Sequence, residues 1–122
     1  MKTPNLIILY VEDPLRSSRF YEKLLGRAPL DGFPSYQCFE LDGGMLLGLW
    51  STAAKDFVSS GSGHRSELAF QVENEETVAR LYEEWKTMGV TIEQALKTAV
   101  FGSTFVGLDP DGHRLRVNTP DS

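Results

Sequence analysis

Two stretches of the chain repeat the same order of apolar and polar positions. The first runs Val11-Glu12-Asp13 and then Phe20-Tyr21-Glu22, and it returns sixty-one residues later as Val72-Glu73-Asn74 and then Leu81-Tyr82-Glu83. A glycine closes each stretch, Gly26 in the first and Gly89 in the second. Internal repetition of this kind indicates units that cannot bury their apolar faces alone and that pack against a copy. We therefore expect two related units, with a functional site where they meet.

The first repeat, residues 4–50, predicts a βαβββ unit. Its first segment, 6–11, is a continuous apolar run, typical of a strand that is covered on both faces. Asp13-Pro14 then supplies a helix N-cap and a proline at the first helical position, and apolar residues recur three and four positions apart as far as Gly26. Three further strands are expected at 27–30, 35–41 and 45–50. The turn Asp42-Gly43-Gly44 predicts a hairpin between the last two.

The second repeat, residues 66–118, predicts the same unit again. A strand at 67–72 precedes Asn74, a helix N-cap residue, and an apolar stripe then ends at Gly89. Trp85 belongs to this stripe, so we expect it in the core. Strands are expected at 90–93, 104–108 and 113–117, the last two joined by the turn 109–112. The polar, Ser- and Gly-rich residues 51–65 predict a linker between the units that can also act as a flap.

Composition narrows the class of protein. With 122 residues, of which 41% are apolar, the chain fits one domain, 1–122, that contains both units. A net charge of -5 and the lack of a basic run argue against a nucleic-acid partner. Apolar runs are far shorter than the roughly 20 residues that cross a bilayer, and no signal peptide is recognised, so we expect no membrane partner and a cytoplasmic protein. Cys38 is the single cysteine, which excludes an internal disulfide.

Several short motifs together resemble one known group over nearly the whole chain. They are Leu9-Tyr10-Val11-Glu12-Asp13-Pro14, Phe20-Tyr21, Leu25-Gly26, Gly48-Leu49-Trp50, Glu67-Leu68-Ala69-Phe70 and the run from Asp109 to Val117. The group is the vicinal oxygen chelate superfamily, which includes glyoxalase I, extradiol dioxygenases, and the bleomycin and phenazine resistance proteins. The resemblance implies an α+β fold in which two βαβββ modules form a cupped mixed sheet around a central cavity, commonly in a homodimer.

The resemblance also implies where a metal would be bound. Metal-dependent members place ligands on the first and last strands of each module, and these places fall on Leu6, Gly48, Glu67 and Arg116. Only Glu67 offers a ligand atom, whereas a catalytic zinc site usually has about three protein ligands. We therefore expect no metal and no cofactor.

Aromatic residues are expected on the cavity side of the first unit. Strand alternation puts Gly48 and Trp50 on one face, and Tyr10 on the corresponding face of the first strand. The missing side chain at Gly48 would leave a slot beside the indole of Trp50, into which a planar ring could slide. Four further candidate ligand-binding residues are phenylalanines. Phe33 and Phe57 lie in loop-like segments that could close over a ligand, and Phe39 and Phe105 fit either the core or the cavity wall.

Charge is expected on the cavity side of the second unit. Arg116 shares its strand face with Arg114 and would attract a carboxylate or phenolate, while Glu67 either pairs with Arg116 or contacts the ligand. The combination resembles the phenazine-type resistance proteins. We therefore expect a homodimeric binding protein, not an enzyme, that sequesters a planar aromatic small molecule such as a phenazine.

Two alternatives stay open. One is a metal-dependent glyoxalase-like lyase or dioxygenase, with ligands from another chain or with a strand register shifted by one position, which would turn every side chain to the opposite face. The other is a regulatory or interaction module whose cavity is filled by its own side chains.

Overall fold

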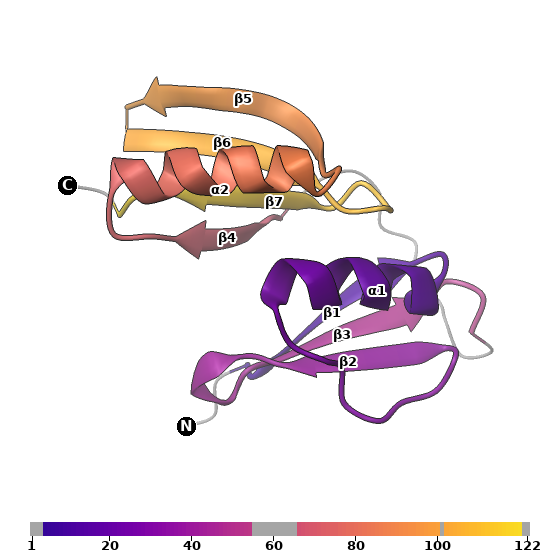
Figure 1. Cartoon of the computed structure of the whole chain (residues 1–122). Coiled ribbons are helices and arrows are strands. Elements are labelled where there is room, and N and C mark those ends of the chain that lie inside the picture. Colours follow the sequence, from indigo (N-terminus) through magenta and orange to yellow (C-terminus); the bar gives the residue numbers. More distant parts are fainter. Residues whose placement is uncertain (1–3, 55–65, 101, 121–122) are drawn as a thin grey trace. The chain divides into compact units, whose positions relative to one another are not determined.

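Each half of the chain folds as one β-sheet with one α-helix against one of its faces (Figure 1). The computed structural model describes residues 4–54, 66–100 and 102–120. It divides the chain into two units, residues 1–61 and 62–122. The sheets have three and four strands, which confirms the predicted α+β class. Among the described helices, none combines the length and the apolar character needed to cross a membrane.

Unit 1 contains strands β1 (Leu6–Val11), β2 (Tyr36–Glu40) and β3 (Leu46–Ser51), and helix α1 (Pro14–Leu25). The strand order is β1-β3-β2, with β1 parallel and β2 antiparallel to β3. A 3-10 turn, η1 (Asp42–Gly44), joins β2 to β3 at the predicted hairpin.

Helix α1 begins and ends at the predicted residues. The carboxylate Oδ1 of Asp13 accepts hydrogen bonds from the backbone N–H groups of Leu15 (3.2 Å) and Arg16 (3.3 Å), and Pro14 occupies the first turn. Gly26 ends the helix in the left-handed conformation, with φ of 69°.

The strand predicted at 27–30 is not formed, so the described part of unit 1 is βαββ instead of βαβββ. Proline at position 29 has no backbone N–H and cannot donate to a neighbouring strand. The segment keeps a hydrogen bond from Leu30 N–H to the carbonyl of Cys38, at 2.8 Å. It therefore follows the edge of the sheet without extending it.

Unit 2 has the complete predicted βαβββ order. Its elements are β4 (Leu68–Gln71), α2 (Glu75–Thr87), β5 (Thr91–Ala99), β6 (Gly102–Leu108) and β7 (Arg114–Asn118). The strand order is β4-β7-β6-β5, with β4 parallel to β7 and the other pairs antiparallel. Asn74 caps α2 by accepting from Thr77 N–H at 2.9 Å, as predicted. Strand β5 is much longer than the predicted 90–93.

The core of each unit lies between its sheet and its helix. In unit 1, Tyr21 of α1 packs against Phe39 of β2, and both are fully buried. In unit 2, Trp85 of α2 packs edge-on against Phe105 of β6, with ring centroids 5.1 Å apart, which confirms the predicted core role of Trp85. Because alternate residues of a strand point to opposite faces, the other face of each sheet carries a second set of side chains.

Candidate functional site

The sheet face of unit 1 that points away from α1 is aromatic and apolar. Across β1 and β3, Tyr10 lies opposite Trp50 and Ile8 opposite Gly48. The intervening residues of β3, Leu47 and Leu49, are buried. The register therefore puts Tyr10, Gly48 and Trp50 on one face, as strand alternation predicted. Their part in ligand binding stays a prediction.

This face exposes large apolar groups. Leu6, Ile8 and Tyr10 are 38%, 43% and 45% exposed. Tyr10 and Trp50 form an edge-to-face pair, with ring centroids 6.4 Å apart and an interplanar angle of 63°. An edge-to-face aromatic pair is a favourable arrangement that gives this part of the sheet a defined shape.

The slot expected over Gly48 is filled by Tyr36, which was not among the predicted ligand-binding residues. A Cβ atom at position 48 would lie 2.4 Å from the phenol oxygen of Tyr36 and 2.9 Å from its Cε1 and Cζ atoms. Tyr36 is opposite Trp50 in the register, and Cys38 is opposite Gly48. The phenol therefore leans along the sheet from the Trp50 position to the Gly48 position. The prediction of an empty slot beside Trp50 was therefore wrong.

The environment of the phenol affects its ionisation. Burial raises the pKa of Tyr36 above the ordinary value of tyrosine, and the hydrogen bond and charge interaction with Cys38 raise it further. The phenol therefore keeps its proton to a higher pH than an ordinary tyrosine does.

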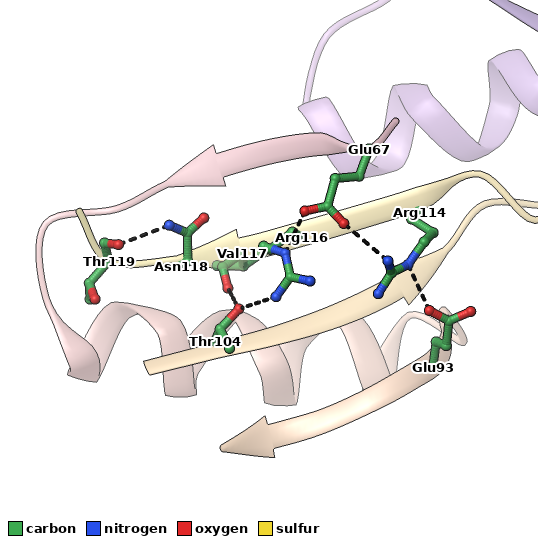
Figure 2. A network of polar contacts seen from close by, with 8 residues as sticks. All are labelled: Glu67, Glu93, Thr104, Arg114, Arg116, Val117, Asn118 and Thr119. Atoms are coloured by element: carbon green, nitrogen blue, oxygen red, sulfur yellow. Dashed lines mark hydrogen bonds and ion pairs between the residues drawn. The ribbon is translucent and has the colours of Figure 1, made fainter. Parts of the chain in front are cut away.

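The sheet face of unit 2 that points away from α2 is charged, as Figure 2 shows. Nε of Arg116 donates to Oε1 of Glu67 at 2.6 Å, and Nη1 of Arg114 lies 3.4 Å from Oε2 of the same carboxylate. Arg114 also places its Nε 2.8 Å from Oε1 of Glu93 on β5. Glu67 and Arg116 therefore pair, which was one of the two roles expected for them.

A threonine on the neighbouring strand ties Arg116 to the sheet. Nη1 of Arg116 donates to Oγ1 of Thr104 at 3.1 Å, and that hydroxyl donates to the carbonyl of Val117 at 2.9 Å (Figure 2). Thr104 is fully buried, and the side chain of Arg116 is only 16% exposed. A guanidinium fixed from two sides is well oriented for recognising a planar acidic group.

The residues present do not fit a metal of the kind that related enzymes bind. Glu67 is the single ligand-bearing residue among the four places that the resemblance implied, and its two oxygens face two guanidinium groups. A cation would have to displace both arginines. Throughout residues 4–54, 66–100 and 102–120, no group of three or more His, Cys, Asp or Glu side chains is close enough together to hold a metal ion.

The four phenylalanine candidates have different positions. Phe39 and Phe105 are fully buried beneath the helices, so they are core residues and not part of the faces that point away from the helices. Phe33 lies in the turn before β2 and is 69% exposed, with a bridge to Tyr36. Phe57 lies outside the described residues.

Comparison with known proteins agrees with this architecture. The phenazine antibiotic resistance protein EhpR of Enterobacter agglomerans is 33% identical over 118 residues, which cover 94% of this chain and 90% of that protein. The solution structure of protein ATC0852 from Agrobacterium tumefaciens is 39% identical, with a TM-score of 0.81 and complete coverage of both chains. A glyoxalase-related enzyme from Fulvimarina pelagi shares the fold, with a TM-score of 0.81, 23% identity, and coverage of 98% of this chain and 88% of that one.

A family model described as the glyoxalase/bleomycin resistance protein/dioxygenase superfamily matches residues 3–117. That match spans nearly the whole chain and includes the described helices and strands of both units, apart from Asn118 at the end of β7. The chain therefore belongs to the glyoxalase/bleomycin resistance protein/dioxygenase superfamily.

Proposed function

We propose that this protein binds and sequesters a planar aromatic small molecule that carries an acidic group, such as a phenazine, without a metal or cofactor. The observation that carries the proposal is the aromatic face of unit 1, where Tyr10, Tyr36 and Trp50 gather on the side of the sheet away from α1. Exposed apolar surface of this kind is typical of a binding site. The name of the relative EhpR, a phenazine antibiotic resistance protein, supports both the class of ligand and a role in resistance.

Non-covalent interactions alone are strong enough to give useful affinity for such a ligand. Stacking between aromatic rings adds about 0.5–1.5 kcal/mol beyond the burial of apolar area, and burial itself contributes about 25 cal/mol for each Å². A charge-assisted hydrogen bond from Arg116 to an acidic group would add about 1.5–3 kcal/mol. After the entropy cost of association is subtracted, micromolar affinity is within reach.

Sequestration confers resistance by mass action. The free drug concentration falls only if protein and drug are present at comparable concentrations and the dissociation constant is low relative to both. The ligand leaves chemically unchanged, which separates this function from the metal-dependent lyases and dioxygenases of the superfamily. We further propose a cytoplasmic homodimer, because small sheets leave open edges that symmetric pairing covers.

Tryptophan fluorescence tests the proposal. Phenazine-1-carboxylate should quench the protein saturably, and cyclohexanecarboxylate should not. In Trp50→Ala the saturable response should be lost, while Trp85, buried against Phe105 in the other unit, keeps the variant fluorescent. Chromatography should show that the phenazine recovered from the protein is chemically unchanged. A modified product would contradict the proposal that the protein only binds its ligand.

The proposed role of Arg116 is tested by comparing two ligands, one with an acidic group and one without. Arg116→Leu should weaken the carboxylate by about 1.5–3 kcal/mol and spare unsubstituted phenazine. The substitution also leaves Glu67 with Arg114 as its remaining described partner, and any general loss of stability affects both ligands equally. The ratio of the two dissociation constants cancels that effect. Equal losses for both ligands would show that Arg116 does not recognise the acid.

A further inference from the structure

The phenol of Tyr36 stands where a side chain at position 48 would stand. Its oxygen and two ring carbons lie within 2.4–2.9 Å of the point that a Cβ of residue 48 would occupy. Glycine at this position is therefore required for the phenol to lie there. The space above Gly48 has the size and shape of an aromatic ring, because an aromatic ring occupies it.

The surroundings of this space match a flat ring with a polar edge. Trp50 lies opposite Tyr36 in the register, Tyr10 lies opposite Trp50 on the far side of β3, and Cys38 lies opposite Gly48. The phenol oxygen has Cys38 as a hydrogen-bond partner. The space therefore accepts a planar ring whose oxygen lies over Gly48 of β3.

The phenol is held less firmly than the aromatic residues of the core. Tyr21 and Phe39 are fully buried between sheet and helix, whereas Tyr36 is only partly buried. A thiol is a weak hydrogen-bond partner, so little polar interaction opposes the release of the phenol. Rotation about the side-chain bonds of a partly exposed tyrosine is fast and moves its ring by several ångströms.

We infer that Tyr36 is a displaceable plug: its phenol occupies the ring-sized space over Gly48, and a ligand enters beside Trp50 by taking the place of that phenol. The inference rests on the proposed function for the identity of the ligand and adds a selectivity rule to it. A ligand is admitted when one of its rings can replace a phenol, which favours flat and hydroxylated aromatic molecules over saturated or branched ones.

A purely structural role makes a different prediction. An aromatic ring that covers a glycine on a neighbouring strand stabilises the sheet by shielding its backbone. In that case Tyr36→Ala should lower stability and leave ligand affinity equal or weaker, because the ligand would lose a neighbour. A plug predicts tighter binding, because the ligand no longer competes with the phenol.

The experiment uses Tyr36→Ala, with Tyr36→Phe as its matched control, which keeps a ring over Gly48. Circular dichroism first establishes that both variants are folded. The first probe is p-cresol at millimolar concentration, followed by its effect on the thermal midpoint and by NMR. We expect p-cresol to bind Tyr36→Ala saturably and to bind the wild type and Tyr36→Phe much more weakly, because in both of these a tethered ring competes for the space. If p-cresol fails to bind Tyr36→Ala, the ring-sized space does not exist and the inference is overturned.

The second probe is phenazine-1-carboxylate, measured by calorimetry. The packing and hydrogen bond that the phenol gives up correspond to about three- to tenfold in the dissociation constant, so Tyr36→Ala should bind the probe tighter by that factor. Equal or weaker binding would overturn the plug and leave the structural role. If phenazine-1-carboxylate binds neither protein, the proposed function fails, and the p-cresol result alone decides whether the plug exists.

Discussion

Replacing Glu67 by glutamine should destabilise the folded protein through the two arginines that share its carboxylate. One oxygen accepts from Nε of Arg116 at 2.6 Å and the other lies 3.4 Å from Nη1 of Arg114. The side chains are 30%, 16% and 23% exposed in the order Glu67, Arg116 and Arg114. Glutamine keeps the shape of the carboxylate and removes its charge. The two guanidinium groups then lie close together without the anion between them.

The magnitude follows from this intermediate burial. Exposed ion pairs contribute up to about 1 kcal/mol, and breaking a buried pair costs about 3–5 kcal/mol. A half-buried carboxylate with two partners lies between these limits, so we expect Glu67→Gln to lower the free energy of unfolding by about 1.5–3 kcal/mol. The thermal midpoint should fall by roughly 3–6 °C for each kcal/mol in a chain of this size.

Urea unfolding, with circular dichroism as the probe, measures the loss. Glu84→Gln on α2 is the matched control, because Glu84 is 55% exposed and lies 3.8 Å from Arg80 in an i,i+4 pair. That substitution should cost less than about 0.5 kcal/mol. In 1 M salt the small effect should vanish and most of the large one should persist, since partly buried charges are screened less. Equal losses for the two variants would refute the reasoning.

Three further predictions concern the turn, the metal and the assembly. Asp109→Ala should lower the free energy of unfolding in urea by about 1–2 kcal/mol, because Oδ1 of Asp109 accepts hydrogen bonds from the N–H groups of Asp111 (2.9 Å) and His113 (2.8 Å) in the turn between β6 and β7. Asp109→Asn should lower it less. A loss from Asp109→Ala as small as that from Glu84→Gln would contradict this account. Elemental analysis of the purified protein should find no stoichiometric zinc, nickel, iron or manganese, and chelators should leave the thermal midpoint unchanged; about one tightly bound metal per chain would contradict the binding-protein proposal. Analytical ultracentrifugation at tens of micromolar should show a homodimer, and a monomer at all concentrations would count against symmetric pairing.

Most helices and strands could be predicted because their signals are local. Asp13, Asn74 and Gly26 fix helix ends through their own side chains or backbone freedom, and the structure places each of them at the expected end. The apolar stripe that includes Trp85 needed only helical periodicity. Such features depend on neighbours within a few positions, and sequence alone describes those neighbours well.

Strand β5 was underestimated because its residues favour another structure. The segment from Glu93 to Lys97 is Glu-Gln-Ala-Leu-Lys, and each of these residues is a strong helix former. In the fold it pairs with β6, with register shifts between Ile92 and Gln94 and between Gln94 and Lys97. Pairing with β6, the next strand along the chain, outweighed the local preference, as tertiary context often does in sheets.

The candidate site likewise has features that could be predicted from the sequence and features that could not. Alternation correctly put Tyr10, Gly48 and Trp50 on one face, because the period of a strand is fixed. It could not say that Tyr36 leans along the sheet and covers Gly48, since the direction of a side chain depends on the space left by its neighbours. Glu93 was missed as a partner of Arg114 because their contact depends on the strand order, in which β5 lies on the side of β6 opposite β7.

The two units differ on the sheet faces that point away from their helices, and this difference points to function. In both units the helix-facing side is a packed apolar core, because every such unit must bury one face of its sheet. The other face is apolar and aromatic around Trp50 in unit 1, and is built from paired charges around Glu67 and Arg116 in unit 2. Exposing Ile8 to water and partly burying Arg116 are each unfavourable, and packing within a unit requires neither. Within the proposed function each face has its own use: the first surface fits a flat aromatic ring, and the second presents a fixed guanidinium to an acidic group.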